Sequence, residues 1–154
     1  MKTLSAFVLA GLFAILVAGC GAKAGPTKTT TDTNFKRIHG AEGAKVQIVC
    51  YYPFNEKHLK IIAWLNSLAD KHPGQVHVTA WDFSTHEGGA AAKEAWGKIC
   101  GGIKINGQSE FKDIMVDDKK QDVSSEGGEW ISWTRPEIEA VVAQAVKEAY
   151  PGAK

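Results

Sequence analysis

The sequence lacks an excess of charge of either sign. Its 154 residues carry 18 Lys and Arg against 17 Asp and Glu, which leaves a formal net charge of +1. Domains that bind nucleic acid need clustered positive charge to meet the phosphate backbone, so no nucleic-acid partner is expected. With 44% apolar residues the chain is able to build a core. Its length allows one domain with appendages.

The sequence also lacks internal repeats and metal-ligand patterns. None of the five histidines has ligand spacing with another histidine or with a cysteine; they are His39, His58, His72, His77 and His86. No metal site is therefore expected, and no cofactor other than a covalent lipid. His58 and His86 fall in the first turns of predicted helices, where a capping or solvated imidazole is favoured over a ligand or a base.

Cysteine is scarce, and the first of the three cysteines follows an apolar run. Lys2 precedes an apolar stretch over residues 4–18, which is shorter than the ~20 residues of a membrane-spanning helix. This pattern predicts an export signal over residues 1–19. The run ends in Val17-Ala18-Gly19-Cys20, which resembles the lipobox of bacterial lipoproteins.

The lipobox resemblance implies cleavage before Cys20 and a lipid on that cysteine. The chain would then be anchored in the bacterial cell envelope by its acyl chains. Gly21, rather than Asp, follows the cysteine. In this family that difference implies the periplasmic face of the outer membrane, if the host is Gram-negative. An ordinary signal peptide with a chance cysteine is the alternative.

Residues 20–42 contain little that a core could bury. They are rich in Gly, Thr and Lys, and we predict the lipidated cysteine followed by a flexible tether. A short edge strand at residues 35–38 is the only element expected there. The folded domain is predicted to occupy residues 43–154.

The first half of this domain has the pattern of a strand–helix–strand unit. Residues 46–51 are nearly all apolar, which indicates a strand buried on both faces. Pro53 ends the strand, and Asn55 is expected to cap a helix that continues to about residue 70. Alternation over residues 76–83 then predicts a parallel partner strand.

The second half predicts a helix, two strands and a final helix. Residues 84–87 resemble a capping box with Ser84 at the cap, and a strand is expected over residues 101–106. Asn106-Gly107 is a strong hairpin signal, because both positions favour positive φ. The fourth strand could follow Gly107 directly or lie near residues 121–124. A second capping box, at residues 134–137, begins the last helix.

The order β-α-β-α-β-β-α resembles the thioredoxin fold over residues 46–149. This resemblance implies a four-stranded mixed sheet with helices on both faces, and it places strand 101–106 antiparallel beside strand 46–51. The chain departs from the family at its functional positions. Residues 52–57 hold no Cys-x-x-Cys motif, and no proline precedes Ile103. The usual dithiol exchange is therefore not carried over.

The predicted sheet would bring Cys50 near Cys100, and three interpretations of the pair stay open. Both could be small buried apolar residues. They could form a structural disulfide, which an oxidising compartment permits. They could also be an exposed thiol pair that is redox-active or binds a soft metal.

We predict a binding or assembly module rather than an enzyme, with a protein partner. The candidate partner-binding residues are aromatic or polar and flank the end of the first strand and a Gly-rich loop: Tyr51, Tyr52, Phe54, Asn55, Trp130 and Trp133. The alternative function is an atypical thiol–disulfide oxidoreductase with Cys50 and Cys100 as its catalytic candidates.

Overall fold

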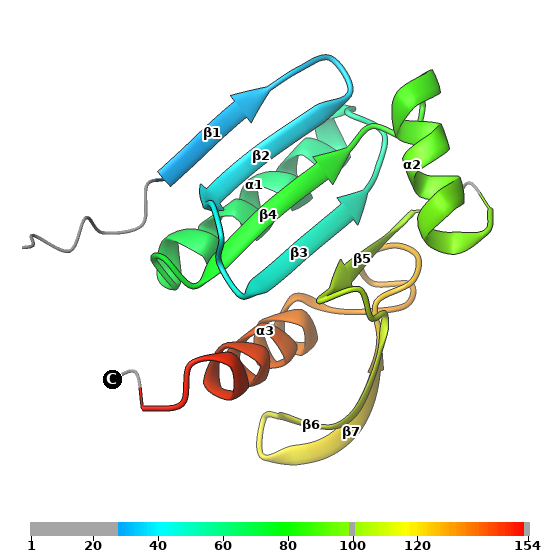
Figure 1. Cartoon of the computed structure of the whole chain (residues 1–154). Helices are drawn as coiled ribbons and strands as arrows, with labels where there is room; N and C mark the ends of the chain where they lie inside the picture. The colour runs from blue at the N-terminus through cyan, green and yellow to red at the C-terminus, as the bar shows by residue number, and fades with distance from the viewer. Residues whose placement is uncertain (1–27, 99–100, 153–154) are drawn as a thin grey trace, which may run out of the picture.

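The computed structural model describes residues 28–98 and 101–152. These residues form a five-stranded mixed sheet, three helices and a separate two-stranded hairpin (Figure 1). The fold class is mixed α/β. The predicted signal peptide, Cys20 and Cys100 lie outside the described residues.

A parallel pair of strands joined by a helix occupies the middle of the sheet. These elements are β3 (Val46–Tyr51), α1 (Glu56–Lys71) and β4 (Val76–Trp81), and the two strands pair in parallel over their full lengths. Asn55 caps α1, because its side-chain oxygen accepts a hydrogen bond from the His58 N–H. The predicted strand–helix–strand unit and its cap are confirmed.

The third predicted strand lies where the sequence placed it. After α2 (His86–Trp96) comes β5 (Gly102–Ile105), which pairs antiparallel with β3 on the side away from β4. Asn106 and Gly107 follow with φ of 50° and 80°, and the residues on either side of them form a β-bridge. The predicted hairpin turn is confirmed.

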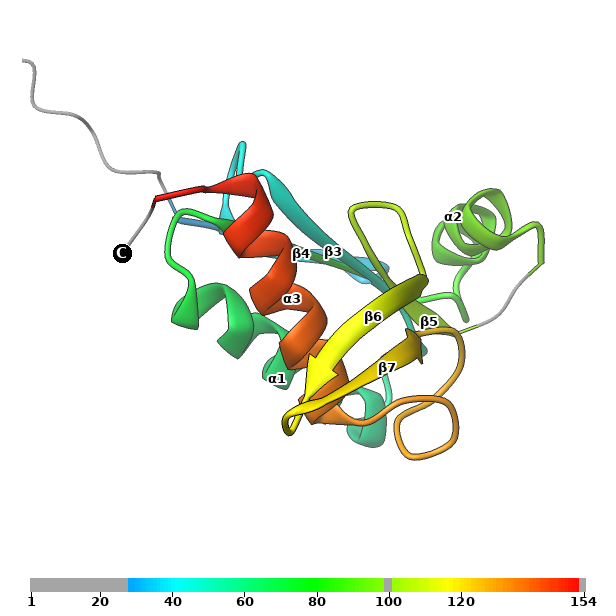
Figure 2. The ribbon, with the colours of Figure 1, turned by 90° about the horizontal axis from the view of Figure 1, so that it is seen from below.

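The chain does not continue as a strand beside β5. Instead β6 (Glu110–Val116) and β7 (Lys119–Ser124) pair with each other and lie beside α3 (Arg135–Ala149), as Figure 2 shows. Only after β7 does the chain return to β5, where the Ile103 N–H donates to the Ser125 carbonyl at 2.9 Å. Both positions considered for the fourth strand are therefore strands of one hairpin.

The prediction of a four-stranded sheet is wrong, because two strands precede β3. They are β1 (Lys28–Asp32) and β2 (Lys36–Ala41), and the strand order is β1-β2-β4-β3-β5. β2 is an interior strand, and residues 28–41 belong to the sheet rather than to a tether. The segment was predicted to be a tether because a run of Thr buries little apolar surface. Thr is nevertheless β-branched, and β-branched residues favour strands, so the same run is able to form an edge strand.

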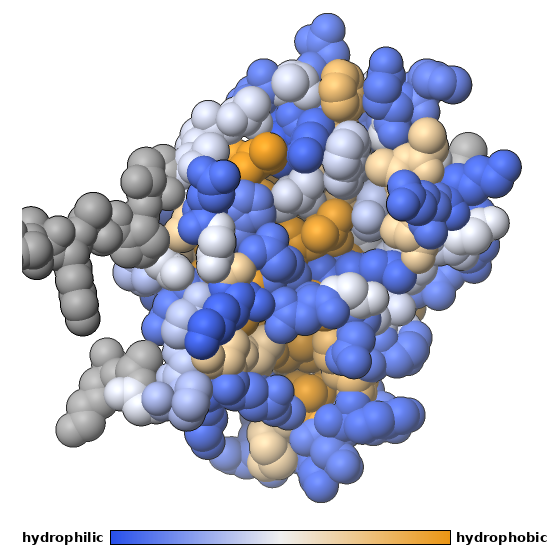
Figure 3. Space-filling view, viewed as in Figure 1, coloured by the Kyte–Doolittle hydropathy of each residue, from blue (hydrophilic) through white to orange (hydrophobic). Residues whose placement is uncertain are grey.

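The two faces of the sheet are covered unequally. The face packed against α1 and α3 carries the most buried strand residues, which are Val46, Ile48, Cys50, Val76, Val78, Ala80, Ile103 and Ile105. On the other face α2 covers only the end near Tyr51. The Tyr51 ring meets the Trp96 ring edge-on, with centroids 6.3 Å apart, which is the geometry of a T-shaped pair. Gln47 and Val49 are half-buried there, so β3 is not buried on both faces. Figure 3 shows this face, with apolar patches among hydrophilic residues.

Candidate functional site

The two segments predicted to form the site meet at the carboxyl end of β3. The carbonyl oxygen of Gly127 accepts hydrogen bonds from the Tyr52 hydroxyl at 2.8 Å and from Trp133 Nε1 at 3.3 Å. Because one carbonyl receives both bonds, it joins the strand end to the loop at residues 127–133. The sequence separation between Tyr52 and Gly127 is 75 residues, so only the fold brings them together.

Three of the predicted partner-binding side chains are buried at this junction. Tyr51 is 7% exposed, Tyr52 2% and Trp133 1%. Burial raises the pKa of the Tyr52 hydroxyl far above its ordinary value. These side chains therefore hold the site together from inside and present almost no surface to a partner.

Phe54 and Asn55 also have structural partners. The Phe54 ring is half-buried, with the Arg37 guanidinium 4.9 Å from its centroid. Asn55 is exposed, but its Oδ1 accepts from the His58 N–H at 3.1 Å and lies 2.9 Å from His58 Nδ1. With Oδ1 as the acceptor, the hydrogen of a neutral His58 is placed on Nδ1.

His58 takes part in this junction by packing on Tyr52 and by contacting the cap residue Asn55. Its ring stacks on Tyr52, with centroids 5.1 Å apart and an interplanar angle of 8°. Partial burial, and then the neighbouring Lys57, lower the pKa of His58 below its ordinary value, so the imidazole is neutral at pH 7. The cap of α1 is Asn55, and the His58 ring contacts this cap residue without capping the helix itself.

The exposed part of the site is an apolar tip formed by Trp130 and Ile131. Their exposed fractions are 77% and 86%, which are the largest among the big apolar side chains of the described residues. Trp130 has a φ of +67°, and its N–H donates to the Trp133 carbonyl at 2.7 Å. The Ile131 N–H donates to the Gly128 carbonyl at 3.2 Å. The tip is therefore a folded turn with defined hydrogen bonds.

A network of buried and charged groups supports the tip. Glu129, whose side chain is 10% exposed, accepts from Arg135 Nε at 2.7 Å and from Nη2 at 3.4 Å. The Arg135 guanidinium lies 5.1 Å from the centroid of a Trp64 ring, and Trp64 stacks on Trp133 with centroids 6.0 Å apart. Glu129, before the tip, is thus joined to Arg135 of α3. Trp133, after the tip, is packed against Trp64 of α1.

The catalytic candidate Cys50 is inaccessible. Its side chain is 0% exposed, and burial raises the pKa of the thiol from 9.0 to about 12. The thiolate is the nucleophile in disulfide exchange, so this thiol is unreactive near neutral pH. β5 pairs with β3 so that Cys50 lies opposite Ile103, and Cys100 lies outside the described residues. Within those residues no group of three or more His, Cys, Asp and Glu could hold a metal ion.

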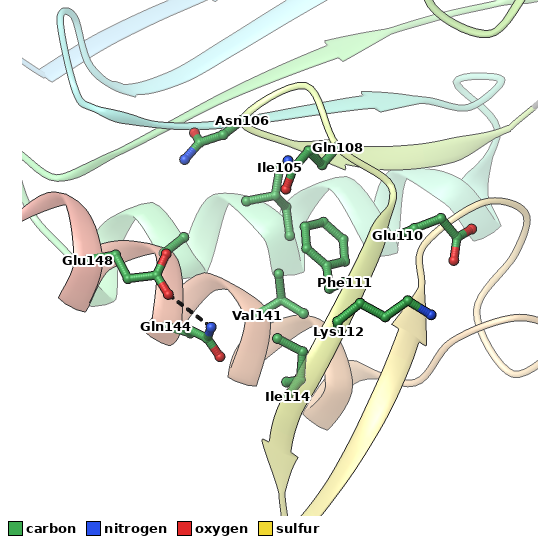
Figure 4. A pocket seen from close by; sticks show the side chains of 11 residues that line it. Ile105, Asn106, Gln108, Glu110, Phe111, Lys112, Ile114, Val141, Gln144 and Glu148 are labelled. Carbon is green, nitrogen blue, oxygen red and sulfur yellow. Dashed lines mark hydrogen bonds between the residues drawn. The ribbon is translucent and has the colours of Figure 1, made fainter.

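Sequence reasoning did not identify a groove of about 360 Å³ between β6 and α3. Figure 4 shows an apolar floor that includes Ile105, Phe111 and Val141. Polar side chains line its margin, where Gln144 Nε2 donates to Glu148 Oε1 at 2.9 Å. No sequence pattern predicts the groove, because one wall comes from β6 and the other from α3, which are separate in the sequence. The described residues that line it include no Ser, Thr, Cys or His.

No protein-family model, no curated protein and no solved structure matches this chain. In the part of the chain that the structure describes, no helix is long and apolar enough to cross a membrane. The geometry of the site therefore carries the functional argument.

Proposed function

We propose that this protein is a lipid-anchored lipoprotein of the bacterial cell envelope, whose α/β domain is a binding or assembly module for a protein partner. The observation that carries the proposal is the apolar tip. Two large apolar side chains, Trp130 and Ile131, are held in solvent by a turn that is fixed on both sides. Trp is among the residues most enriched at the energetic centres of protein interfaces.

The conformation of the tip supports a binding role over a chance exposure. A bulky residue at positive φ costs on the order of 1–3 kcal/mol, and such strain is concentrated at functional sites. The supporting groups, Glu129 with Arg135 and Trp64 with Trp133, fix the turn before any partner arrives. A preorganised contact loses less entropy on binding than a mobile one.

The thioredoxin-like part of the proposal rests on the arrangement of the inner strands. β4, β3 and β5 lie side by side in that order, with β5 antiparallel to β3. Residues 125 and 126 run beside β5, through the Ser125 carbonyl and a bridge between Gly102 and Glu126. In the proposed thioredoxin-like arrangement, these two residues would correspond to the fourth strand. The extra strands β1 and β2 and the separate β6–β7 hairpin are departures from it.

The envelope part of the proposal rests on the lipobox resemblance at Val17-Ala18-Gly19-Cys20. The first described residue, Lys28, begins β1 at the end of the sheet where β4 also begins. The apolar tip lies beyond the opposite end, next to the carboxyl end of β3 (Figure 1). Anchoring and partner binding would therefore use different ends of the domain.

The alternative function, thiol–disulfide exchange through Cys50 and Cys100, has less support. It requires an accessible thiol of depressed pKa, and Cys50 has neither property. A soft-metal site that uses Cys50 meets the same obstacle.

Site-specific photocross-linking in the native host tests the binding role. A benzophenone amino acid at position 130 or 131 of the full chain is expected to form one defined protein adduct. The matched control is position 115, because Met115 is also exposed, at 55%, but lies on β6. Trp130→Ala should abolish the adduct formed from position 131. Adducts with lipid alone, or the same adducts from position 115, would contradict the proposal.

Mass spectrometry of the mature protein tests the anchor separately. We expect the chain to begin at Cys20 and to carry a thioether-linked diacylglyceryl group. An unmodified Cys20 would refute the anchor and leave the binding role of the tip untouched.

A further inference from the structure

The end of the domain at which β1 begins carries a groove that belongs neither to the apolar tip nor to its supporting network. It lies between the turn after α1 and the last turn of α3, and its volume is about 760 Å³. Lys71 and His72 line one side, and Lys147, Tyr150 and Pro151 line the other. Figures 1 and 2 both show the end of α3, and the turn from α1 to β4, at the same end of the molecule as the start of β1. The groove is therefore at the end from which the chain leads back to the predicted anchor.

The titratable side chains that line this groove are basic. Among its described lining residues there is no Asp or Glu, whereas Lys71, His72 and Lys147 supply two ammonium groups and an imidazole. Lys147 is exposed, and no carboxylate of a described residue pairs with it. Lys71 lies 3.2 Å from Glu139, but their side chains are 57% and 41% exposed, and such a surface pair is easily exchanged for another anion. The groove is thus complementary in charge to an anionic group.

Apolar surface accompanies these charges. Pro73 and Pro151 line the groove and are exposed. The Tyr150 ring is half-buried and fixed, because its hydroxyl accepts from the Lys45 N–H at 2.8 Å and the Lys45 ammonium lies 5.0 Å from its centroid. Tyrosine beside basic groups is typical of the boundary between lipid headgroups and acyl chains, where one end of the ring is apolar and the other is wet.

The predicted anchor keeps this end of the domain close to a membrane. Cys20 precedes Lys28, the start of β1, by eight positions. A chain of that length spans at most ~29 Å when fully extended. A lipid on Cys20 would therefore hold the groove near the headgroups and make its encounter with them intramolecular, so that weak contacts are enough to orient the domain.

We propose that this groove is a membrane-docking surface, which binds the headgroups of anionic phospholipids and orients the domain on its anchor. The inference rests on the lipid anchor of the proposed function and adds the orientation of the domain to it. With the groove docked, the apolar tip projects from the far end of the domain, away from the membrane (Figure 1). The tip is then presented to a protein partner and kept out of the bilayer interface, where an exposed indole would otherwise partition.

The processed full chain, reconstituted in lipid vesicles, tests the anchor and the docking by different readouts. Flotation with vesicles of phosphatidylcholine alone reports the anchor, because acyl chains insert without help from headgroup charge. Failure to float would refute the anchor and this inference together. The docking is read from a fluorophore on Ala143→Cys, which is exposed in the groove, with a quencher attached to a lipid headgroup. Ala90→Cys is the reference, because Ala90 is exposed on α2, away from the groove. Both chains also carry Cys100→Ser, so that each label has a single accessible thiol.

Addition of phosphatidylglycerol to the vesicles should increase quenching at position 143 about threefold and leave position 90 unchanged, since each ammonium group gains affinity near an anionic surface. High salt should reverse the increase without releasing the protein from the vesicles, because it screens headgroup charge and leaves the acyl chains inserted. Lys71→Gln combined with Lys147→Gln should abolish the increase.

The matched control is Lys57→Gln with Lys93→Gln, which removes the same charge from two exposed lysines away from the groove and should leave the increase intact. Circular dichroism confirms that each variant is folded. The docking surface would be overturned by quenching at position 143 that does not respond to phosphatidylglycerol, by equal quenching at positions 143 and 90, or by an equal loss in the two double variants. Each of these results leaves the anchor standing, because flotation is measured on the same protein.

Discussion

At the scale of single residues, Trp130 combines two unfavourable features, a left-handed backbone and an indole exposed to water. Its φ is +67° and its exposed fraction 77%. Glycine adopts this φ without the steric cost that a side chain incurs. Glycine relieves the backbone strain of the folded state, but it also gives the unfolded chain more conformational entropy. Because the relief of strain is the larger effect, we expect Trp130→Gly to raise the free energy of unfolding by about 1 kcal/mol. Urea denaturation followed by circular dichroism measures this difference.

The same substitution should abolish partner binding, so stability and function would change in opposite directions. Ile131→Ala is the matched control, because Ile131 is exposed and not strained. It should weaken binding while changing stability by less than about 0.5 kcal/mol. A clear loss of stability in Trp130→Gly would show that the indole contributes to the fold and not to an interface.

Cys50 is predicted to be chemically silent in the folded protein. The rise of its pKa from 9.0 to about 12 lowers the thiolate fraction near neutral pH roughly a thousandfold, and full burial blocks reagents as well. Alkylation with iodoacetamide at pH 8, read by peptide mass spectrometry, should leave Cys50 unlabelled until guanidinium chloride is added. Native labelling at the rate of an ordinary thiol would revive the oxidoreductase hypothesis.

At the scale of elements, α2 packs closely at Gly88 on the backbone of Asp82, the residue that follows β4. A Cβ at this position would overlap the Asp82 carbonyl oxygen. Helix propensity alone favours Ala over Gly by about 1 kcal/mol. The overlap should reverse that sign, and we expect Gly88→Ala to destabilise the protein by about 2 kcal/mol in thermal or urea unfolding.

Ala90→Gly supplies the control for Gly88→Ala, because position 90 is exposed on the same helix. It should cost about 0.5–1 kcal/mol from backbone entropy alone. A stabilising Gly88→Ala would mean that α2 is free to move away from Asp82.

Local signals in the sequence located most of the helix ends. Asn55 caps α1, Gly97 ends α2 in the left-handed conformation, and Thr134 with Glu137 forms a capping box. At α2 the cap is Thr85 rather than Ser84. The Ser84 hydroxyl instead donates to buried Asp82 at 2.5 Å. Two adjacent hydroxyl residues have similar cap propensity, and the local hydrogen bonds of Ser84 to Asp82 leave Thr85 as the cap.

Non-local pairing explains what the sequence could not predict. β1 lacks a strong apolar pattern and was not expected. A strand was expected at residues 35–38, but as a short edge strand, whereas β2 is an interior strand because it pairs with β1 on one side and with β4 on the other. In the site, the Gly-rich loop was predicted, but Trp130 and Trp133 have opposite roles. Trp133 is buried because it stacks on Trp64 and its Nε1–H donates to the Gly127 carbonyl. The contact with Trp64 of α1 exists only in the assembled fold.

At the scale of the whole molecule, three titratable groups are concentrated at the carboxyl end of β3. Burial is the first cause that raises the pKa values of Cys50, Tyr51 and Tyr52. Each group is neutral in the folded protein at pH 7, and the Tyr52 hydroxyl also bonds to Gly127 in the loop that carries the apolar tip. The end of β3 is therefore where a high pH should act on the fold and on the site together.

The protein should lose stability as the pH rises above about 9. The unfolded chain releases the Cys50 proton near pH 9, whereas the folded chain keeps it until about pH 12, so unfolding is coupled to proton release over this window. The free energy of unfolding should fall by about 1.4 kcal/mol per pH unit from this group. Tyr51 and Tyr52 should add to the slope above pH 10, because their pKa values are also raised from 10.0.

Urea denaturation between pH 7 and 11 measures this slope, and two substitutions apportion it. Cys50→Ala should make the decline less steep from pH 9 upward. Tyr52→Phe should do so only above pH 10, and at every pH it should also lose the hydrogen bond to Gly127 that fixes the tip. If that bond transmits order to the tip, Tyr52→Phe will weaken partner binding at neutral pH although Tyr52 is buried. Equal slopes in all three proteins would show that these groups ionise as readily in the folded chain as in the unfolded one, and that the junction is open to water.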